Sequence, residues 1–266
     1  MKSTILFTIF LLGMAVAIFA QTESDFQATV TSDGQGVVIT RYTGTIAAVR
    51  IPLTIQGMPV REIGESAFRD NRTITSVVIP VGITIIQAGA FSGATRLASV
   101  TLPEGLVRIG RYAFNNTPAL TTITLPQTLT ELGAYSFYSS GLTHITLPGS
   151  LIFRVHHYEN WNGGPSHVFA ESKNLRTVVI SEGITGIPTQ MFQGCTALTS
   201  VTLPSTITII RGSAFYGCTA LTTVNIPESV VSIDLSGYQG GSAFMNTNLP
   251  LATQARLRRL GYTSDF

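Results

Sequence analysis

The stretch Ser99–Leu120, with the sequence SVTLPEGLVRIGRYAFNNTPAL, sets the pattern that most of the chain repeats. The repeat is 23 residues long and is marked by a phenylalanine, an aliphatic residue six positions later and a proline six positions after that. These fixed points recur as Phe68-Ile74-Pro80, Phe91-Leu97-Pro103, Phe114-Leu120-Pro126, Phe169-Leu175-Ser181, Phe192-Leu198-Pro204 and Phe215-Leu221-Pro227, with serine in place of proline at 181. Such a period is typical of stacked units that cannot bury their apolar faces alone, so the chain is predicted to form a solenoid.

Each repeat predicts one strand, one bend and one short turn. The residues before each proline alternate, as in Val100 and Leu102, which indicates a strand with one face buried. The glycine of Ile109-Gly110 indicates a sharp bend, and the Tyr-Ala-Phe segment that follows predicts a short helical or 3₁₀ turn. The phenylalanines of successive turns are expected to stack as a ladder along the back of the coil.

The two ends of the solenoid are predicted to be capped. Residues 21–45 hold two apolar runs around the turn-like segment 32–35, which predicts a hairpin that covers the first turn. Residues 250–266 begin with a helix pattern that has proline in its first turn and Gly261 after its end. Three arginines near this end suit the helix dipole, and a ligand-binding patch is the alternative.

The repeats occupy residues 46–249, and two insertions interrupt them, at 153–166 and 233–241. Insertions in a solenoid are expected to leave the coil as loops, which often bind partners.

The first twenty residues differ from the rest of the chain. Lys2 is followed by an uncharged apolar run, and Ala20 offers a small residue for cleavage, so residues 1–20 are predicted to be a secretory signal peptide. The run is short for a membrane span, although an uncleaved anchor is the alternative. The chain is therefore expected to be exported, to the cell surface, the periplasm or the medium, with no membrane span in the mature protein.

Charge and cysteine content narrow the class of protein further. Charged residues make up 11% of the chain and the net charge is +2, which gives no basic stripe for binding nucleic acid.

The two cysteines, Cys195 and Cys218, lie one repeat apart at the same repeat position. Residues in register are about 4.8 Å apart with parallel Cα–Cβ bonds, so two buried free thiols are expected, with a disulfide as the alternative.

The pattern Leu-x-x-Val-x-Leu-Pro, followed by Leu-x-x-Ile-Gly-x-x-Ala-Phe, resembles the leucine-rich repeats of the BspA-like bacterial surface antigens over residues 26–249. The resemblance implies a leucine-rich repeat solenoid of the α/β class, mainly β. The expected form is a curved right-handed coil of about eight 23-residue repeats, with a parallel concave sheet, an N-terminal hairpin cap and a C-terminal helical cap. It also implies adhesion or protein recognition at a cell envelope, without naming a ligand.

The outward residues of the strands form the first candidate binding surface. Four of them, Thr122, Thr124, His144 and Thr146, lie on two neighbouring turns of the predicted coil. This surface is rich in hydroxyl groups that can donate or accept hydrogen bonds. The alternative is that serine and threonine simply suit a wet strand face.

The insertion 153–166 is the second candidate. Aromatic and histidine side chains gather here: His156, His157, Tyr158 and Trp161. Tyrosine and tryptophan dominate recognition hot spots, so this loop is predicted to bind a partner, with Tyr238 of the second insertion added to the contact set. A zinc site using two histidines and Glu159 and a merely tolerated loop are the alternatives, although no metal-ligand spacing is met.

The sequence contains no Gly-x-Ser-x-Gly, no His-Glu-x-x-His and no phosphate-binding glycine loop, so neither an enzyme nor a bound cofactor is expected. The predicted function is an exported protein that binds a protein or extracellular-matrix ligand, or a glycan. The alternative is a structural envelope protein that self-associates and has no foreign ligand.

Overall fold

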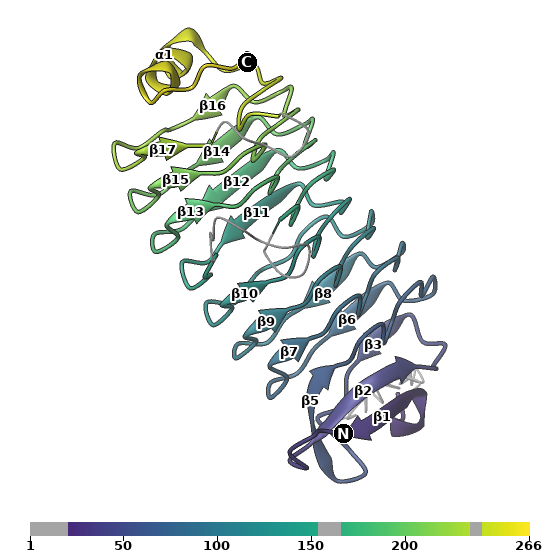
Figure 1. The fold of residues 1–266 in the computed structure, drawn as a ribbon. Coiled ribbons are helices and arrows are strands. Elements are labelled where there is room, and N and C mark those ends of the chain that lie inside the picture. The colour runs from purple at the N-terminus through teal and green to yellow at the C-terminus, as the bar shows by residue number, and fades with distance from the viewer. Residues whose placement is uncertain (1–20, 154–165, 235–240) are drawn as a thin grey trace, which may run out of the picture.

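The structure, a computed structural model, describes residues 21–153, 166–234 and 241–266. These residues form a β-solenoid of about eight turns with a repeat of about 23 residues, parallel sheets and one C-terminal helix (Figure 1). The two ends of the described chain lie at opposite ends of the coil. The predicted architecture is therefore confirmed.

The N-terminal cap is the predicted hairpin. After a short 3₁₀ turn, η1 (Glu23–Asp25), strand β1 (Phe26–Val30) pairs antiparallel with β2 (Val37–Tyr42). Strand β2 then pairs in parallel with β5 (Met58–Ile63), which β4 (Thr54–Ile55) joins from the other direction. The hairpin therefore covers the edge of the first coil turn, and its sheet continues into the repeats.

The predicted strands form one row along the coil, but the row is split into two sheets. The first sheet holds β3 (Ala48–Arg50), β6 (Ser76–Val78) and β8 (Ser99–Thr101), and the second holds β11 (His144–Leu147), β12 (Thr177–Ile180), β14 (Ser200–Thr202) and β16 (Thr223–Val224). Residues 122–124 between them are not a strand, which corrects the expectation of one unbroken sheet.

The break lies beside a turn that is one residue shorter than the turns on either side. Phe137 is followed by the next buried leucine, Leu142, after five positions, where the turns of Phe68 to Phe114 and of Phe169 to Phe215 have six. A Cβ atom at Gly141 in this short turn would overlap the carbonyl oxygen of Pro118 in the turn before it. The shortened turn of Phe137 therefore packs closely against the turn of Phe114, beside the break in the strand row.

A second row of parallel strands, which the sequence did not predict, follows the first around the coil (Figure 1). Each strand has only two residues, and they are β7 (Ile85–Ile86), β9 (Arg108–Ile109), β10 (Glu131–Leu132), β13 (Gly186–Ile187), β15 (Ile209–Ile210) and β17 (Ser232–Ile233). The first three continue the sheet of the N-terminal cap, and the last three form a separate sheet.

The core is organised by the predicted phenylalanine ladder. Phe68, Phe91 and Phe114 stack with ring centroids 4.8 and 5.1 Å apart, and all three rings are buried. The ladder continues through Phe137, Phe169, Phe192, Phe215 and Phe244. Tyr42 of the hairpin stacks on its first ring at 5.2 Å, and Tyr262 meets its last ring edge-on at 6.1 Å. The prediction of one aligned row is confirmed.

The turns that carry these phenylalanines are not the predicted helical or 3₁₀ turns. Their N–H groups donate alternately to the next coil turn, as from Phe68 to Ala90 at 2.7 Å, and within their own turn, as from Arg69 to Ser66 at 3.0 Å. In the turns of Phe68 to Phe215, the backbone has positive φ two residues before and two residues after each ladder phenylalanine, as at Tyr112 (55°) and Asn116 (54°). Gly110, which was expected to bend the chain, instead allows two successive turns to approach closely. A Cβ atom at this position would lie 2.7 Å from the backbone nitrogen of Ala88 in the preceding turn.

The C-terminal cap contains helix α1 (Leu251–Arg259), which is the predicted helix. Leu257 is buried, and the hydroxyl of Tyr262 accepts a hydrogen bond from the N–H of Phe244 at 3.2 Å. The arginines make structural contacts: Arg256 pairs with Glu228 at 3.1 Å, and the guanidinium of Arg258 lies 4.8 Å from the centroid of the Phe266 ring.

Cys195 and Cys218 are buried free thiols, as predicted. Their Sγ atoms donate to the carbonyl oxygens of Phe169 and Phe192, at 3.2 and 3.1 Å. Burial raises the pKa of the Cys218 thiol to about 12, so it stays protonated and unreactive. Among the described residues, no helix is long and apolar enough to cross a membrane.

Candidate interaction surface

The outward side chains of the first strand row form a continuous surface, here called the strand face. In β11, His144 and Thr146 are exposed, whereas Ile145 and Leu147 between and after them are buried. The same alternation defines the other members of the strand face: Ser76, Val78, Ser99, Thr101, Thr122, Thr124, Thr177, Val179, Ser200, Thr202, Thr223 and Asn225. These side chains therefore point outward from the coil, as the sequence predicts.

Thr122, Thr124, His144 and Thr146 lie at the centre of the strand face. The first two stand in the break between the two sheets, where Ile123 keeps the alternation by pointing into the core with 9% of its surface exposed. Their backbone is not a strand, so this part of the predicted site has a different local structure from its neighbours.

Most of the hydroxyl groups on the strand face are unused by the fold. The side chains of Thr101, Thr124 and Thr146 make no hydrogen bond within the described part of the chain. By contrast, the threonine just before β6, β11, β14 and β16 bonds to the preceding turn, as Thr199 Oγ1 does to the carbonyl oxygen of Arg176 at 3.0 Å. The fold therefore uses one set of threonines and leaves the other free to bind.

Two members of the strand face are already occupied. Asn225 exchanges two hydrogen bonds with the backbone of Leu203, both at 2.8 Å, and thereby replaces a missing strand contact. Nδ1 of His144 lies 3.1 Å from the hydroxyl oxygen of Thr143. The imidazole is exposed, so its other nitrogen remains available to a partner.

The remaining predicted site residues, His156, His157, Tyr158, Trp161 and Tyr238, lie outside the described residues. The partner loop and its zinc alternative are therefore untested by the structure. In the described part of the chain, no group of three or more histidine, cysteine or acidic residues is placed to hold a metal ion.

An aromatic column outside the core escaped the sequence analysis. Tyr112 stacks on Tyr135 at 4.9 Å, and Tyr135 stacks on His167 at 4.5 Å with an interplanar angle of 10°. All three stand two residues before a core phenylalanine, so the repeat register could have revealed the column. Burial lowers the pKa of His167, and its Nδ1 is buried with no partner among the described residues.

The fold and its regular outward face define a leucine-rich repeat protein. The model of the BspA type leucine rich repeat region matches residues 61–159 and 165–255, with six copies of the repeat. This match covers most of the chain, which therefore belongs to the family of BspA-type leucine-rich repeat proteins. A comparison with curated protein sequences finds no relative.

Solved bacterial structures support the same assignment. The leucine-rich repeat protein TpLRR of T. pallidum is 28% identical, with a TM-score of 0.66, and the match covers 92% of this chain and 98% of that one. A leucine rich cell surface protein of Faecalibacterium prausnitzii is 29% identical, with a TM-score of 0.52 and coverage of 86% and 53%. A leucine-rich repeat protein of Bacteroides ovatus, 24% identical, shares the fold with a TM-score of 0.72 and coverage of 85% and 56%. The chain thus spans about half the length of the last two proteins.

Proposed function

We propose that this chain is an exported, non-enzymatic protein of the cell envelope that recognises a protein or extracellular-matrix ligand through its strand face and insertion loops. The signal-like pattern of residues 1–20 supports export, and the F. prausnitzii cell surface protein provides a similar fold in that setting. The destination is the cell surface, the periplasm or the medium. Residues 153–166 and 233–241 extend the recognition surface.

The single observation that carries the proposal is the row of unpaired hydroxyl groups on the strand face. Each hydroxyl can donate one hydrogen bond and accept others, and each bond contributes about 0.5–1.5 kcal/mol net. Several such bonds along a rigid coil give a specific contact without any deep pocket. The coil keeps the hydroxyls at a fixed spacing, so little side-chain freedom is lost on binding.

A charge placed at the centre of this face tests the proposal. The double variant Thr124→Glu, Thr146→Glu is screened against immobilised fibronectin, collagen and laminin beside the unaltered protein. We expect the unaltered protein to bind at least one of these, and the variant to bind about tenfold more weakly, because two carboxylates replace hydroxyl donors.

The matched control carries the same charges elsewhere. Val81 and Val231 are 69% and 75% exposed and lie outside the strand face, so Val81→Glu, Val231→Glu should bind like the unaltered protein. Equal binding by the strand-face variant and this control would contradict the proposal, provided that both variants keep the melting temperature of the unaltered protein.

Self-association is the second candidate function. Its support is that, from β6 to β16, the described strand face carries no lysine, arginine, aspartate or glutamate, and that Val179 on this face is 42% exposed. Light scattering of the purified protein separates the two functions. A concentration-dependent increase in mass that the Thr124→Glu, Thr146→Glu variant abolishes would favour self-association over recognition of a foreign ligand.

A further inference from the structure

A notch interrupts the surface of the phenylalanine turns near the N-terminal end of the coil. The turn of Phe91 carries only small residues around its phenylalanine, Ala88, Gly89, Ser92 and Gly93. The turns on either side carry larger ones at the same repeat positions: Glu65, Ser66, Arg69 and Asp70 before it, and Arg111, Tyr112, Asn115 and Asn116 after it. The result is a cavity of about 310 Å³ between the two flanking turns.

One layer of the outer aromatic column is missing at this notch. Tyr112 stacks on Tyr135 through one ring face. Gly89 holds the equivalent position one turn earlier and lines the cavity together with Tyr112. The core rings of successive turns here have centroids 4.8 and 5.1 Å apart, which is the spacing of stacked rings. The space above Gly89, where a side chain is missing from the column, is therefore deep enough for one ring. A ring bound in the notch would continue the stack.

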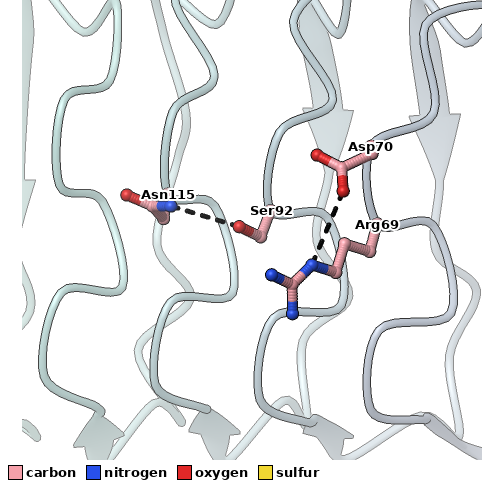
Figure 2. A network of polar contacts seen from close by, with 4 residues as sticks. All are labelled: Arg69, Asp70, Ser92 and Asn115. Carbon is pink, nitrogen blue, oxygen red and sulfur yellow. Dashed lines mark hydrogen bonds and ion pairs between the residues drawn. The ribbon is translucent and has the colours of Figure 1, made fainter.

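Hydrogen-bonding groups of both kinds line the same cavity. Figure 2 shows the guanidinium of Arg69 reaching over the neighbouring turn, while its Nε lies 3.6 Å from Asp70. On the other side, Asn115 Nδ2 donates to Ser92 Oγ at 3.1 Å, which leaves the amide oxygen of Asn115 free to accept (Figure 2). Exposed Glu65 adds a carboxylate to the lining.

The charges at the notch cancel. Among the residues that line it, Glu65 is negative and Arg69 is positive. Next to the lining, the Arg111 guanidinium lies over the Tyr112 ring, 5.4 Å from its centroid, and Asp70 pairs with Arg69. A neutral ligand therefore suits the site better than an anion or a cation.

We propose that this notch binds one neutral pyranose unit of a glycan. A pyranose ring has an apolar C–H face that stacks on Tyr112 and hydroxyl groups at its edge that reach Glu65, Arg69 and Asn115. An aromatic side chain would fill the same layer, but it would remove water from these polar groups without replacing their hydrogen bonds. In a small-molecule site, a few placed polar groups fix the orientation of the ligand, which is the role that Glu65, Arg69 and Asn115 would have here.

The variant that fills the notch is Gly89→Tyr. Its Cβ would have Ser66 Oγ at 3.4 Å as its nearest neighbour, and Tyr112 and Tyr135 already hold this backbone position at φ 55° and 59°, close to the 61° of Gly89. The new ring is therefore expected to take the layer that the sugar would occupy. The control is Gly34→Tyr, at a glycine with φ 70° and open space around it, in the hairpin turn.

Binding is measured by saturation-transfer NMR with the methyl glycosides of glucose, galactose, mannose and N-acetylglucosamine. We expect at least one glycoside to bind the unaltered protein and Gly34→Tyr equally, and Gly89→Tyr and Tyr112→Ala to bind about tenfold more weakly or not at all. Phenylalanine amide, the probe for an aromatic side chain, should not displace the glycoside.

The proposal is overturned if none of the four glycosides binds, if Gly89→Tyr binds as well as Gly34→Tyr, or if phenylalanine amide displaces the sugar. This site is separate from the strand face, so the Thr124→Glu, Thr146→Glu variant should keep the sugar signal. Loss of glycoside binding in that variant would also overturn the assignment of the sugar to the notch, whereas the matrix-protein screen tests the strand face independently.

Discussion

His167, the last ring of the column formed with Tyr112 and Tyr135, makes the stability of the fold depend on pH. Its ring is stacked on Tyr135, and burial holds its pKa below the ordinary value of 6.5. The unfolded chain therefore takes up a proton at a higher pH than the folded chain does. The contribution of this residue to stability is complete above pH 6.5 and decreases as the pH falls below it.

The replacement His167→Gln tests this dependence, since Gln190 already holds the same repeat position one turn later. Between pH 7.5 and 5.5, the free energy of unfolding in urea should fall more in the unaltered protein than in His167→Gln. Exposed His144 supplies the control, so His144→Gln should keep the full pH dependence. An identical pH dependence in all three proteins would contradict the burial of a neutral imidazole.

The ladder of phenylalanines is the element on which the coil depends. Phe114 is fully buried and stacks on both neighbouring rings, at 5.1 and 5.2 Å. Replacing it by alanine removes these contacts and leaves a cavity, so Phe114→Ala should lower the free energy of unfolding by about 3–5 kcal/mol. Chemical denaturation measures this loss.

The control for this prediction is Phe114→Leu, which keeps most of the apolar volume and should cost clearly less than the alanine variant. Unfolding of Phe114→Ala at the same denaturant concentration as the unaltered protein would show that the ladder does not carry the core.

The elements differ in how well the sequence predicts them. The strands of the first row and the ladder are predictable, because their apolar residues repeat in every turn and their burial follows from the period. The second row is not predictable, because two-residue strands such as Ile85–Ile86 are too short to show an alternating pattern.

The backbone conformation of the phenylalanine turns is not visible in the sequence either. Tyr112 and Tyr135 have positive φ, which tyrosine rarely adopts, because the hydrogen bonds between successive turns impose it. The sequence does show small residues on both sides of Phe91, at 88–90 and 92–94, but only the structure places the larger side chains of the neighbouring turns beside them to form the notch.

At the scale of the whole molecule, a solenoid is a one-dimensional stack in which each turn contacts only its neighbours. Removing one full period should therefore join two equivalent points of the coil. Deletion of residues 104–126 removes 23 residues and the break at 122–124, and it brings β8 next to β11 in the first strand row. The shortened chain should fold, and the two sheets of that row should become one.

The measurement is a crystal structure or backbone NMR assignment of the shortened chain, with circular dichroism as the first check of folding. A deletion of residues 104–115 removes about half a period and serves as the control, because it places strand residues opposite turn residues and puts polar side chains into the core. We expect the control to be unfolded or aggregated. If both deletions fold equally well, the register of the repeat does not determine the stacking; if the full-period deletion fails to fold, the turn at 104–126 is required for more than its place in the stack.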